Sequence, residues 1–334
     1  MKRTAFLFAI VLFIIVVFTN SCSEKRIKIG LLMDEILLER WSKDKDLFIK
    51  RANEKEAEVL VEVANSDPVI QFELARKLLD EGIDILVLVP VDLNDAARIV
   101  QLAHQYDVRV LSYDRLVKNC NLDFYISFDN VEVGKIQAEY LAKICPKGNY
   151  ALIGGATTDN NSILLKIGQM NVLQPFVEKG DISIIYDQFV DKWNQEEGYR
   201  HMKNCLDISN NNIDAVIAAN DALATGAARA LEEHNMKGQV YMAGQDADLI
   251  ACQRIVAGTQ TITVYKPIEA IATKAADIAI KMAKKEDFET TQLTVNNGKK
   301  MVPALLLPPM LVNKETIRLT VIADGYLKEN KIYQ

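Results

Sequence analysis

The chain has 334 residues, with 39 Lys and Arg against 45 Asp and Glu, so its formal net charge at pH 7 is −6. At roughly 100–200 residues per domain, this length predicts two domains. The acidic balance leaves no basic stripe to hold a phosphate backbone, which excludes nucleic acid as the expected partner.

The N-terminal segment differs in composition from everything after it. Lys2 and Arg3 are followed by an unbroken apolar run over 5–18, and Cys22 comes shortly after that run. A cationic start and an apolar run of about 14 residues predict a secretory signal peptide over 1–21, because a membrane span needs about 20. A cysteine at this place resembles the cleavage site of bacterial lipoproteins, in which it is acylated and becomes the mature N-terminus.

We therefore expect an exported protein that is anchored to a membrane through lipidated Cys22 and faces the periplasm or the cell exterior. Two or more acyl chains would make that attachment stable. The alternatives are an ordinary signal peptide with a chance cysteine, and an uncleaved anchor.

From residue 27 onward, short apolar runs alternate with longer amphipathic segments. This alternation is typical of βα units built around a parallel sheet. In the first half of the chain we expect strands at 27–33, 58–63, 83–90 and 108–113, and helices at 68–80 and 94–106. In the second half we expect strands at 150–153, 182–186, 215–219 and 239–243, and helices at 131–144, 162–178, 196–206 and 222–233.

The last third of the chain is less regular. A strand is expected over 261–265 and a helix over 268–284, followed by a polar stretch and an extended segment over 302–312. Prolines at 303, 308 and 309 argue against a central antiparallel strand there and suit a segment that passes between domains.

The predicted fold class is α/β, with two similar doubly wound parallel-sheet lobes joined by a three-segment hinge. The three crossings are expected at 129–131, 265–267 and 305–308. The N-terminal lobe would comprise 27–130 plus 267–304, and the C-terminal lobe 131–266 plus 305–334. Several short connections of this kind permit closure around a ligand while restraining sliding.

Many of the apolar runs stop abruptly at polar or aromatic residues. These runs are LVLVPVD, VRVLSYDR, FYISFDN, IIYDQFVDKW, DAVIAAND, YMAGQDAD and ITVYKP. Open α/β sheets bind their ligands at the carboxyl ends of the strands, so the pattern predicts a polar cleft. The candidate binding residues are Arg40, Trp41, Asp114, Arg115, Asp159, Asn161, Trp193, Asn220, Asp246 and Lys266.

Trp41 and Trp193 are expected in loops just after strands. A flat indole covers the C–H face of a sugar ring, and Asp–Arg pairs grip vicinal hydroxyls through two hydrogen bonds at once. The alternatives are structural. Each Trp would plug a loop onto the core, and the Asp–Arg pairs would be salt bridges between lobes. One of Asp159, Asn160 and Asn161 would cap a helix, and Asn220 and Asp246 face the same choice between capping and binding.

No arrangement of residues predicts catalysis, a metal or a cofactor, so the chain is not expected to be an enzyme. Its histidines lie in helical segments and are expected at the solvated surface: His104, His201 and His234. Four cysteines show neither CxxC nor metal spacing, and buried thiols are favoured over a single disulfide: Cys120, Cys145, Cys205 and Cys252.

At this point the sequence resembles the periplasmic sugar-binding proteins of ABC importers, and most closely their D-xylose-binding members. The segments that carry the resemblance are KIGLLMDEILLERWSKD, VLSYDR, DFYISFDNVEVGKIQA, GGATTDNN, QFVDKW, AANDA, GQDADL, AGTQTITVYKP and VNNGKKMVP. It covers nearly the whole chain from residue 27. It implies a two-lobe protein that closes on one monosaccharide, with the candidate residues named above as its sugar contacts.

The resemblance implies delivery of D-xylose to an ABC permease. The alternative is a sugar-sensing subunit that presents xylose, arabinose, ribose or glucose to a membrane sensor kinase. A third class, the sugar-responsive repressor, needs an N-terminal helix-turn-helix, and here the predicted export signal occupies that place.

Overall fold

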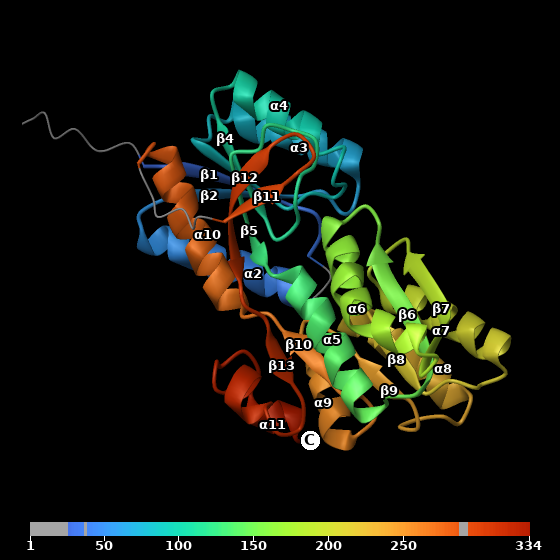
Figure 1. Ribbon diagram of the computed structural model, residues 1–334. Helices are drawn as coiled ribbons and strands as arrows, with labels where there is room; N and C mark the ends of the chain where they lie inside the picture. Colours follow the sequence, from blue (N-terminus) through green and yellow to red (C-terminus); the bar gives the residue numbers. More distant parts are fainter. Residues whose placement is uncertain (1–25, 37–38, 287–292) are drawn as a thin grey trace, which may run out of the picture.

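The N-terminal lobe is built on a seven-stranded sheet. The structure is a computed structural model and describes residues 26–36, 39–286 and 293–334 (Figure 1). The strand order is β11-β12-β5-β4-β3-β1-β2, and the pairs are parallel except that β11 runs antiparallel to β12. The strands are β1 (Lys28–Met33), β2 (Glu58–Val63), β3 (Ile85–Leu88), β4 (Arg109–Tyr113), β5 (Phe124–Phe128), β11 (Thr294–Asn296) and β12 (Met301–Leu307).

Helices cover both faces of this sheet, because its strands are apolar on both sides. Helices α2 and α10 share one hydrophobic core with it, and α3 and α4 share another. Their bounds are α2 (Glu39–Glu54), α3 (Pro68–Asp80), α4 (Ala97–Gln105) and α10 (Ile268–Ala283). A parallel sheet with helices on both faces is the arrangement of a doubly wound α/β fold.

The C-terminal lobe repeats this plan with a four-stranded parallel sheet in the order β7-β6-β8-β9. Its elements are α5 (Asn130–Ile144), β6 (Gly148–Ala156), α6 (Asn160–Glu178), β7 (Ile182–Val190), α7 (Gln195–Ser209), β8 (Ala215–Ala218), α8 (Asp221–Glu233), β9 (Tyr241–Ala243) and α9 (Leu249–Ala257). The strands β10 (Thr263–Tyr265) and β13 (Met310–Val312) form an antiparallel pair beside it. The chain ends in a π-helical turn (Arg318–Ile322) and in α11 (Glu329–Ile332).

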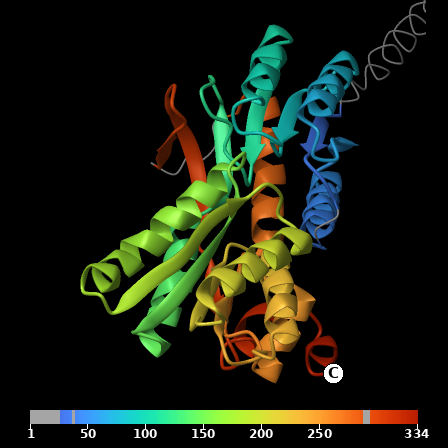
Figure 2. The same ribbon diagram turned by 90° about the vertical axis from the view of Figure 1, so that its right-hand side faces the viewer.

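Among the described residues, the chain passes between the lobes at three places. These are the β5–α5 junction at Asp129, the β10–α10 junction at Lys266, and the step from β12 to β13 at Pro308. In both views the N-terminal lobe, blue to cyan with the orange α10, lies beside the green to yellow C-terminal lobe (Figure 2).

Strand β12 differs from the expectation. It stays in the N-terminal sheet through Leu307, so the boundary expected between residues 304 and 305 falls inside a strand. It is also a central strand, although it contains Pro303. The sheet tolerates this proline because parallel pairing with β5 begins only at Ala304, so the missing N–H of Pro303 removes no bond to β5.

The helix pairs of the C-terminal lobe pack unusually closely at glycines. A Cβ on Gly134 of α5 would lie 2.0 Å from the carbonyl oxygen of Leu165, and one on Gly168 of α6 would lie 2.0 Å from that of Val131. Gly198 of α7 and Gly226 of α8 make the same reciprocal contact. These glycines therefore set how closely the helices approach, and with them the position of the helix N-termini.

Two expectations about single residues can be compared with the structure. The four cysteines are buried thiols, as favoured: Cys120, Cys145, Cys205 and Cys252. The expectation of a solvated His201 is wrong, because its ring is 6% exposed and its Nδ1 lies 2.8 Å from the hydroxyl of Tyr186. Helix α7 packs this side of its surface against β7, which carries Tyr186, so the imidazole is covered and has a hydrogen-bond partner. Within the described residues, no helix combines the length and the apolar character needed to cross a membrane.

Candidate functional site

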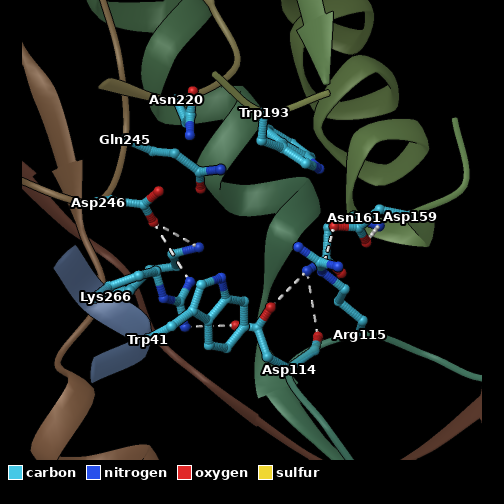
Figure 3. Close-up of a pocket in the computed structure, with 11 residues that line it drawn as sticks. Trp41, Asp114, Arg115, Asp159, Asn161, Trp193, Asn220, Gln245, Asp246 and Lys266 are labelled. Carbon is cyan, nitrogen blue, oxygen red and sulfur yellow. Dashed lines mark hydrogen bonds and ion pairs between the residues drawn. The ribbon is translucent and has the colours of Figure 1, made fainter. Parts of the chain in front are cut away.

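The structure brings every candidate binding residue into one pocket between the lobes. The pocket has an empty volume of about 300 Å³ and is lined by Arg40, Trp41, Asp114, Arg115, Asp159, Asn161, Trp193, Asn220, Gln245, Asp246 and Lys266. Trp41 and Trp193 lie on opposite sides of the open space, with Lys266 toward one end and Arg115 toward the other (Figure 3).

The N-terminal lobe supplies a cationic group held between carboxylates. Arg40 donates to Asp114 at 2.8 Å and to Asp44 at 3.3 Å, and its guanidinium lies 4.4 Å from the centre of the Trp41 ring. Trp41 was expected in a loop but lies in the first turn of α2 and is 2% exposed. Phe48 and other apolar residues of α2 pack in the core against the sheet, which holds the first turn of this amphipathic helix at the pocket.

The C-terminal lobe contributes pocket residues from the starts of its helices. Asp159 caps α6 by accepting from the N–H of Asn161 at 2.8 Å, and Asn220 caps α8 by accepting from that of Leu223 at 2.9 Å. Both residues also line the pocket. Capping and binding were opposed as alternatives, but a cap occupies one oxygen and leaves the rest of the side chain directed at the cleft.

Polar contacts join the two lobes across the pocket. Arg115 lies 2.9 Å from Asp159, and Asn161 donates to the carboxylate of Asp114 at 2.9 Å. The salt bridge considered as an alternative for the Asp114–Arg115 pair is therefore present, and it borders the pocket. The lobes are consequently closed on each other in this structure.

The hinge itself contributes one pocket residue, Lys266. Lys266, between β10 and α10, contacts Asp246 at 2.9 Å, and Arg40 of the other lobe lies 3.4 Å from the same oxygen of that carboxylate. Asp246 follows β9 and has a φ of 93°, an unusual left-handed conformation that turns its side chain toward the pocket. One carboxylate thus connects both lobes and the hinge.

Comparison with known proteins agrees with this architecture of two α/β lobes, a hinge of three chain crossings and a polar pocket at the strand ends. The family model of the periplasmic binding protein domain matches residues 29–287. This chain belongs to the periplasmic binding protein family. The predicted fold class is confirmed, and so is the prediction of a binding protein rather than an enzyme.

Curated relatives of this periplasmic binding protein match it over almost its full length. It is 45% identical to the D-xylose-binding periplasmic protein of Haemophilus influenzae over 95% of both chains. It is 45% identical to the D-xylose-binding periplasmic protein of Escherichia coli over 92% of this chain and 93% of that protein. Among solved structures, the carbohydrate transporter solute-binding protein from Chloroflexus aurantiacus, in complex with D-glucose, superposes with a TM-score of 0.85 at 25% identity, covering 92% of this chain and 98% of that one.

The charges in the pocket of this periplasmic binding protein stabilise one another. Burial opposes ionisation of Asp114, but Arg40, Lys266 and Arg115 outweigh it and lower the pKa of this carboxyl below its ordinary value. Burial likewise opposes the charge on Arg40, yet the surrounding carboxylates raise its pKa well above the ordinary value. The pocket therefore presents permanent donors and acceptors at neutral pH, which is what hydroxyl groups need for strong, charge-assisted hydrogen bonds.

Several polar atoms of the pocket have no hydrogen-bond partner within the described residues. They are the indole N–H groups of Trp41 and Trp193 and the amide oxygen of Gln245. Gln245 was missed by the sequence interpretation, although it directly precedes Asp246 at the end of β9. A buried donor or acceptor without a partner costs about 1–3 kcal/mol, so these atoms favour a ligand that hydrogen-bonds to them.

The described residues contain no group of three His, Cys, Asp or Glu side chains that could hold a metal ion. The chemistry that the pocket offers is hydrogen bonding and stacking. Cys22 and the predicted signal peptide lie outside the described residues.

Proposed function

We propose that this periplasmic binding protein binds one molecule of D-xylose in the pocket between its lobes and delivers it to an ABC importer. The observation that supports this most strongly is the composition of the pocket. Two indoles, three Arg or Lys and six carboxylates or amides from both lobes meet around an open space of about 300 Å³. The two curated relatives at 45% identity are D-xylose-binding proteins.

The pocket chemistry suits a pyranose. A flat indole packs against the C–H face of a sugar ring, and Trp41 and Trp193 flank the open space. Around the edge, Asp114, Asp246 and Arg115 offer planar groups that bind vicinal hydroxyls through pairs of hydrogen bonds.

Binding and closure are coupled in this proposal. The sugar contacts come from both lobes, so only the closed form makes all of them, and the ligand shifts the population toward that form. The membrane partner then distinguishes the closed form from the open one. No covalent step is involved.

Isothermal titration of residues 23–334 tests the proposal, with D-xylose, D-glucose, D-ribose and L-arabinose as ligands. Micromolar or tighter one-to-one binding of D-xylose, with weaker binding of the others, is the expected result. Tight binding of a different sugar alone would keep the binding mechanism and replace the ligand, and no binding to any sugar would reject the site.

We also propose that the protein is exported and anchored through lipidated Cys22. Growth of the producing cells with a labelled fatty acid should label the wild type and leave Cys22→Ser unlabelled. The wild type should then partition with membranes and the variant should not. Equal partition of the two proteins would contradict the anchor.

Delivery to a permease and presentation to a sensor kinase use the same pocket, so only the partner distinguishes them. Cross-linking of the full-length protein in membranes, in the presence of D-xylose, should capture ABC permease subunits. Capture of a histidine kinase in their place would favour the sensing alternative.

A further inference from the structure

Gly155 lies at the end of β6, directly behind one of the pocket tryptophans. A Cβ added to Gly155 would lie 2.0 Å from Cη2 of Trp193, 2.2 Å from Cζ2 and 2.5 Å from Cζ3. Ordinary van der Waals contact between carbon atoms begins near ~3.5 Å. The outer edge of the Trp193 ring therefore rests on the bare backbone of Gly155, and no other residue type leaves room for it.

The backbone explains why this glycine faces the ring. The pairing of β6 with β7 shifts its register between Gly154 and Ala156, so Gly155 is the extra residue of a bulge at the carboxyl end of β6. A bulge redirects a residue at a strand end, often beside a binding site. Gly155 is not among the glycines with positive φ, so its importance lies in the space it leaves rather than in a left-handed backbone.

Trp193 separates Gly155 from the pocket. Trp193 lines the pocket, whereas Gly155 does not. The backbone that follows Trp193 is held in place, because the next residue, Asn194, caps α7 by accepting from the N–H of Glu197 at 3.0 Å. A side chain at position 155 would therefore move the ring away from β6 and toward the space between the two indoles.

We propose that Gly155 is a specificity-determining residue of this pocket, because it fixes the depth at which the Trp193 ring lies and so the width left for the sugar between Trp193 and Trp41. This inference rests on the proposed sugar site. When the Trp193 ring rests on Gly155, the space between the two indoles has room for one pyranose. A displaced ring narrows this space and discriminates most strongly against ligands that carry an additional CH₂OH group.

The test is Gly155→Ala, titrated with D-xylose and D-glucose. Overpacking of this kind should weaken D-xylose binding by roughly 10- to 100-fold, and D-glucose binding by a larger factor. The matched control is Gly154→Ala on the same strand, whose Cβ would lie 2.7 Å from Cδ1 of Phe189. Phe189 does not line the pocket, so this variant meets a similar clash and should bind D-xylose like the wild type.

A double-mutant cycle separates ring displacement from general damage. The three atoms nearest to Gly155 belong to the six-membered ring of the indole, which extends beyond the reach of a phenylalanine. Trp193→Phe alone should bind D-xylose more weakly than the wild type. Adding Gly155→Ala to this variant should change its D-xylose affinity less than 3-fold. This pair also serves if Gly155→Ala alone does not fold, because the double variant should then fold and bind like Trp193→Phe.

Tryptophan emission gives a readout that does not need a ligand. The chain has two Trp residues, so the signal has few sources. Gly155→Ala should change the emission of the unliganded protein, and Gly154→Ala should not. Equal D-xylose affinity of Gly155→Ala and wild type, or an equal loss in both backgrounds, would overturn the inference. A wild type that binds no sugar, together with the expected change in emission, would instead reject the proposed function and keep the packing of Trp193 on Gly155.

Discussion

At the scale of single residues, Asp246 is the group on which most of the site converges. Its carboxylate contacts Lys266 at 2.9 Å and Arg40 at 3.4 Å, and its side chain is 8% exposed. Two buried cations therefore share this one anion, which is the closer partner of Lys266 and a third partner of Arg40. We expect a residue of this kind to affect both ligand affinity and the free energy of unfolding, because removing it leaves a buried charge without a partner.

Asp246→Ala should therefore weaken D-xylose binding by at least about 30-fold. Removing one partner of a buried, hydrogen-bonded charge pair costs about 2–5 kcal/mol, much of it from the partner that is left unpaired. Titration calorimetry measures the affinity, and circular dichroism melting shows whether the variant is folded. Affinity within 3-fold of the wild type in a folded variant would exclude Asp246 from the site.

Asp221 is a buried carboxylate beneath the pocket rather than a part of its lining. It accepts hydrogen bonds from the hydroxyl of Thr263 at 2.7 Å, the amide of Gln260 at 2.9 Å and the N–H of Asp248 at 3.1 Å. Its own N–H donates to the carbonyl of Gln245. It thus ties the start of α8 to the loop that carries Gln245 and Asp246. Burial nevertheless raises the pKa of Asp221 to about 7.

This shift predicts a pH dependence of stability. The folded state holds the Asp221 proton up to about pH 7, whereas the unfolded chain releases it near ~4, so Asp221 favours folding below that window and loses this contribution as pH rises through 7. Asp221→Asn is neutral throughout. The free energy of unfolding of the wild type minus that of Asp221→Asn should therefore fall between pH 4 and 8, by on the order of a few kcal/mol.

Urea unfolding at a series of pH values measures this difference, and the exposed Asp207→Asn serves as the control for a general charge effect. A difference that stays constant over the whole range, or that rises with pH, would contradict the assignment of a raised pKa to Asp221.

At the scale of elements, the close approach of α5 and α6 positions one side of the pocket. A side chain at Gly134 or Gly168 would collide with the backbone of the facing helix. Asp159 caps α6, and Asn161 lies in its first turn. Backbone carbonyls cannot rotate aside as a flexible side chain can. A methyl group at Gly134 must therefore push the two helices apart.

Gly134→Ala should lower the free energy of unfolding by about 1–3 kcal/mol through overpacking, and weaken D-xylose binding because Asn161 moves with α6. Chemical denaturation and titration calorimetry test the two effects. Glu139→Ala, at an exposed position of the same helix, should change neither. Unchanged stability in Gly134→Ala would show that the helices separate without cost.

At the scale of the whole molecule, the contacts across the pocket indicate a hinge that closes. Arg115 contacts Asp34 of its own lobe at 2.6 Å and Asp159 of the other lobe at 2.9 Å, while Asn161 reaches Asp114 across the same gap. Three connections at the hinge allow the lobes to rotate about one axis and restrain other motions. The ligand and these pairs therefore stabilise the same closed state.

Small-angle X-ray scattering should show a decrease in the radius of gyration when D-xylose is added to the wild type. Arg115→Ala removes both the cross-lobe pair and a proposed sugar contact, so it should show a smaller decrease and at least 10-fold weaker binding. Arg98→Ala, at an exposed position, should behave like the wild type. A wild-type scattering curve that does not change at saturating sugar would contradict closure.

Most helices and strands, and most residues of the pocket, could be predicted from local patterns in the chain. Apolar runs of strand length, each ending in Asp, Asn, Arg, Trp or Lys, are local patterns, and the carboxyl ends of parallel strands meet at one edge of a sheet whatever the rest of the chain does. For this reason Asp114, Trp193 and Asn220 could be named before the fold was known. Trp41 was also named, although its helical position was not recognised.

Features that depend on residues far apart in the chain could be recognised only in the folded protein. Pro303 is tolerated inside the first sheet because its neighbours β5 and β11 pair with different parts of β12. Gln245 lines the pocket and His201 is buried because other elements pack against them. The hydrophobic periodicity of the sequence does not reveal such contacts. The seat of Trp193 on Gly155 requires a bulge between two strands. Local sequence specifies which side chains a strand end presents, whereas their exact spacing depends on packing between elements that only the folded chain brings together.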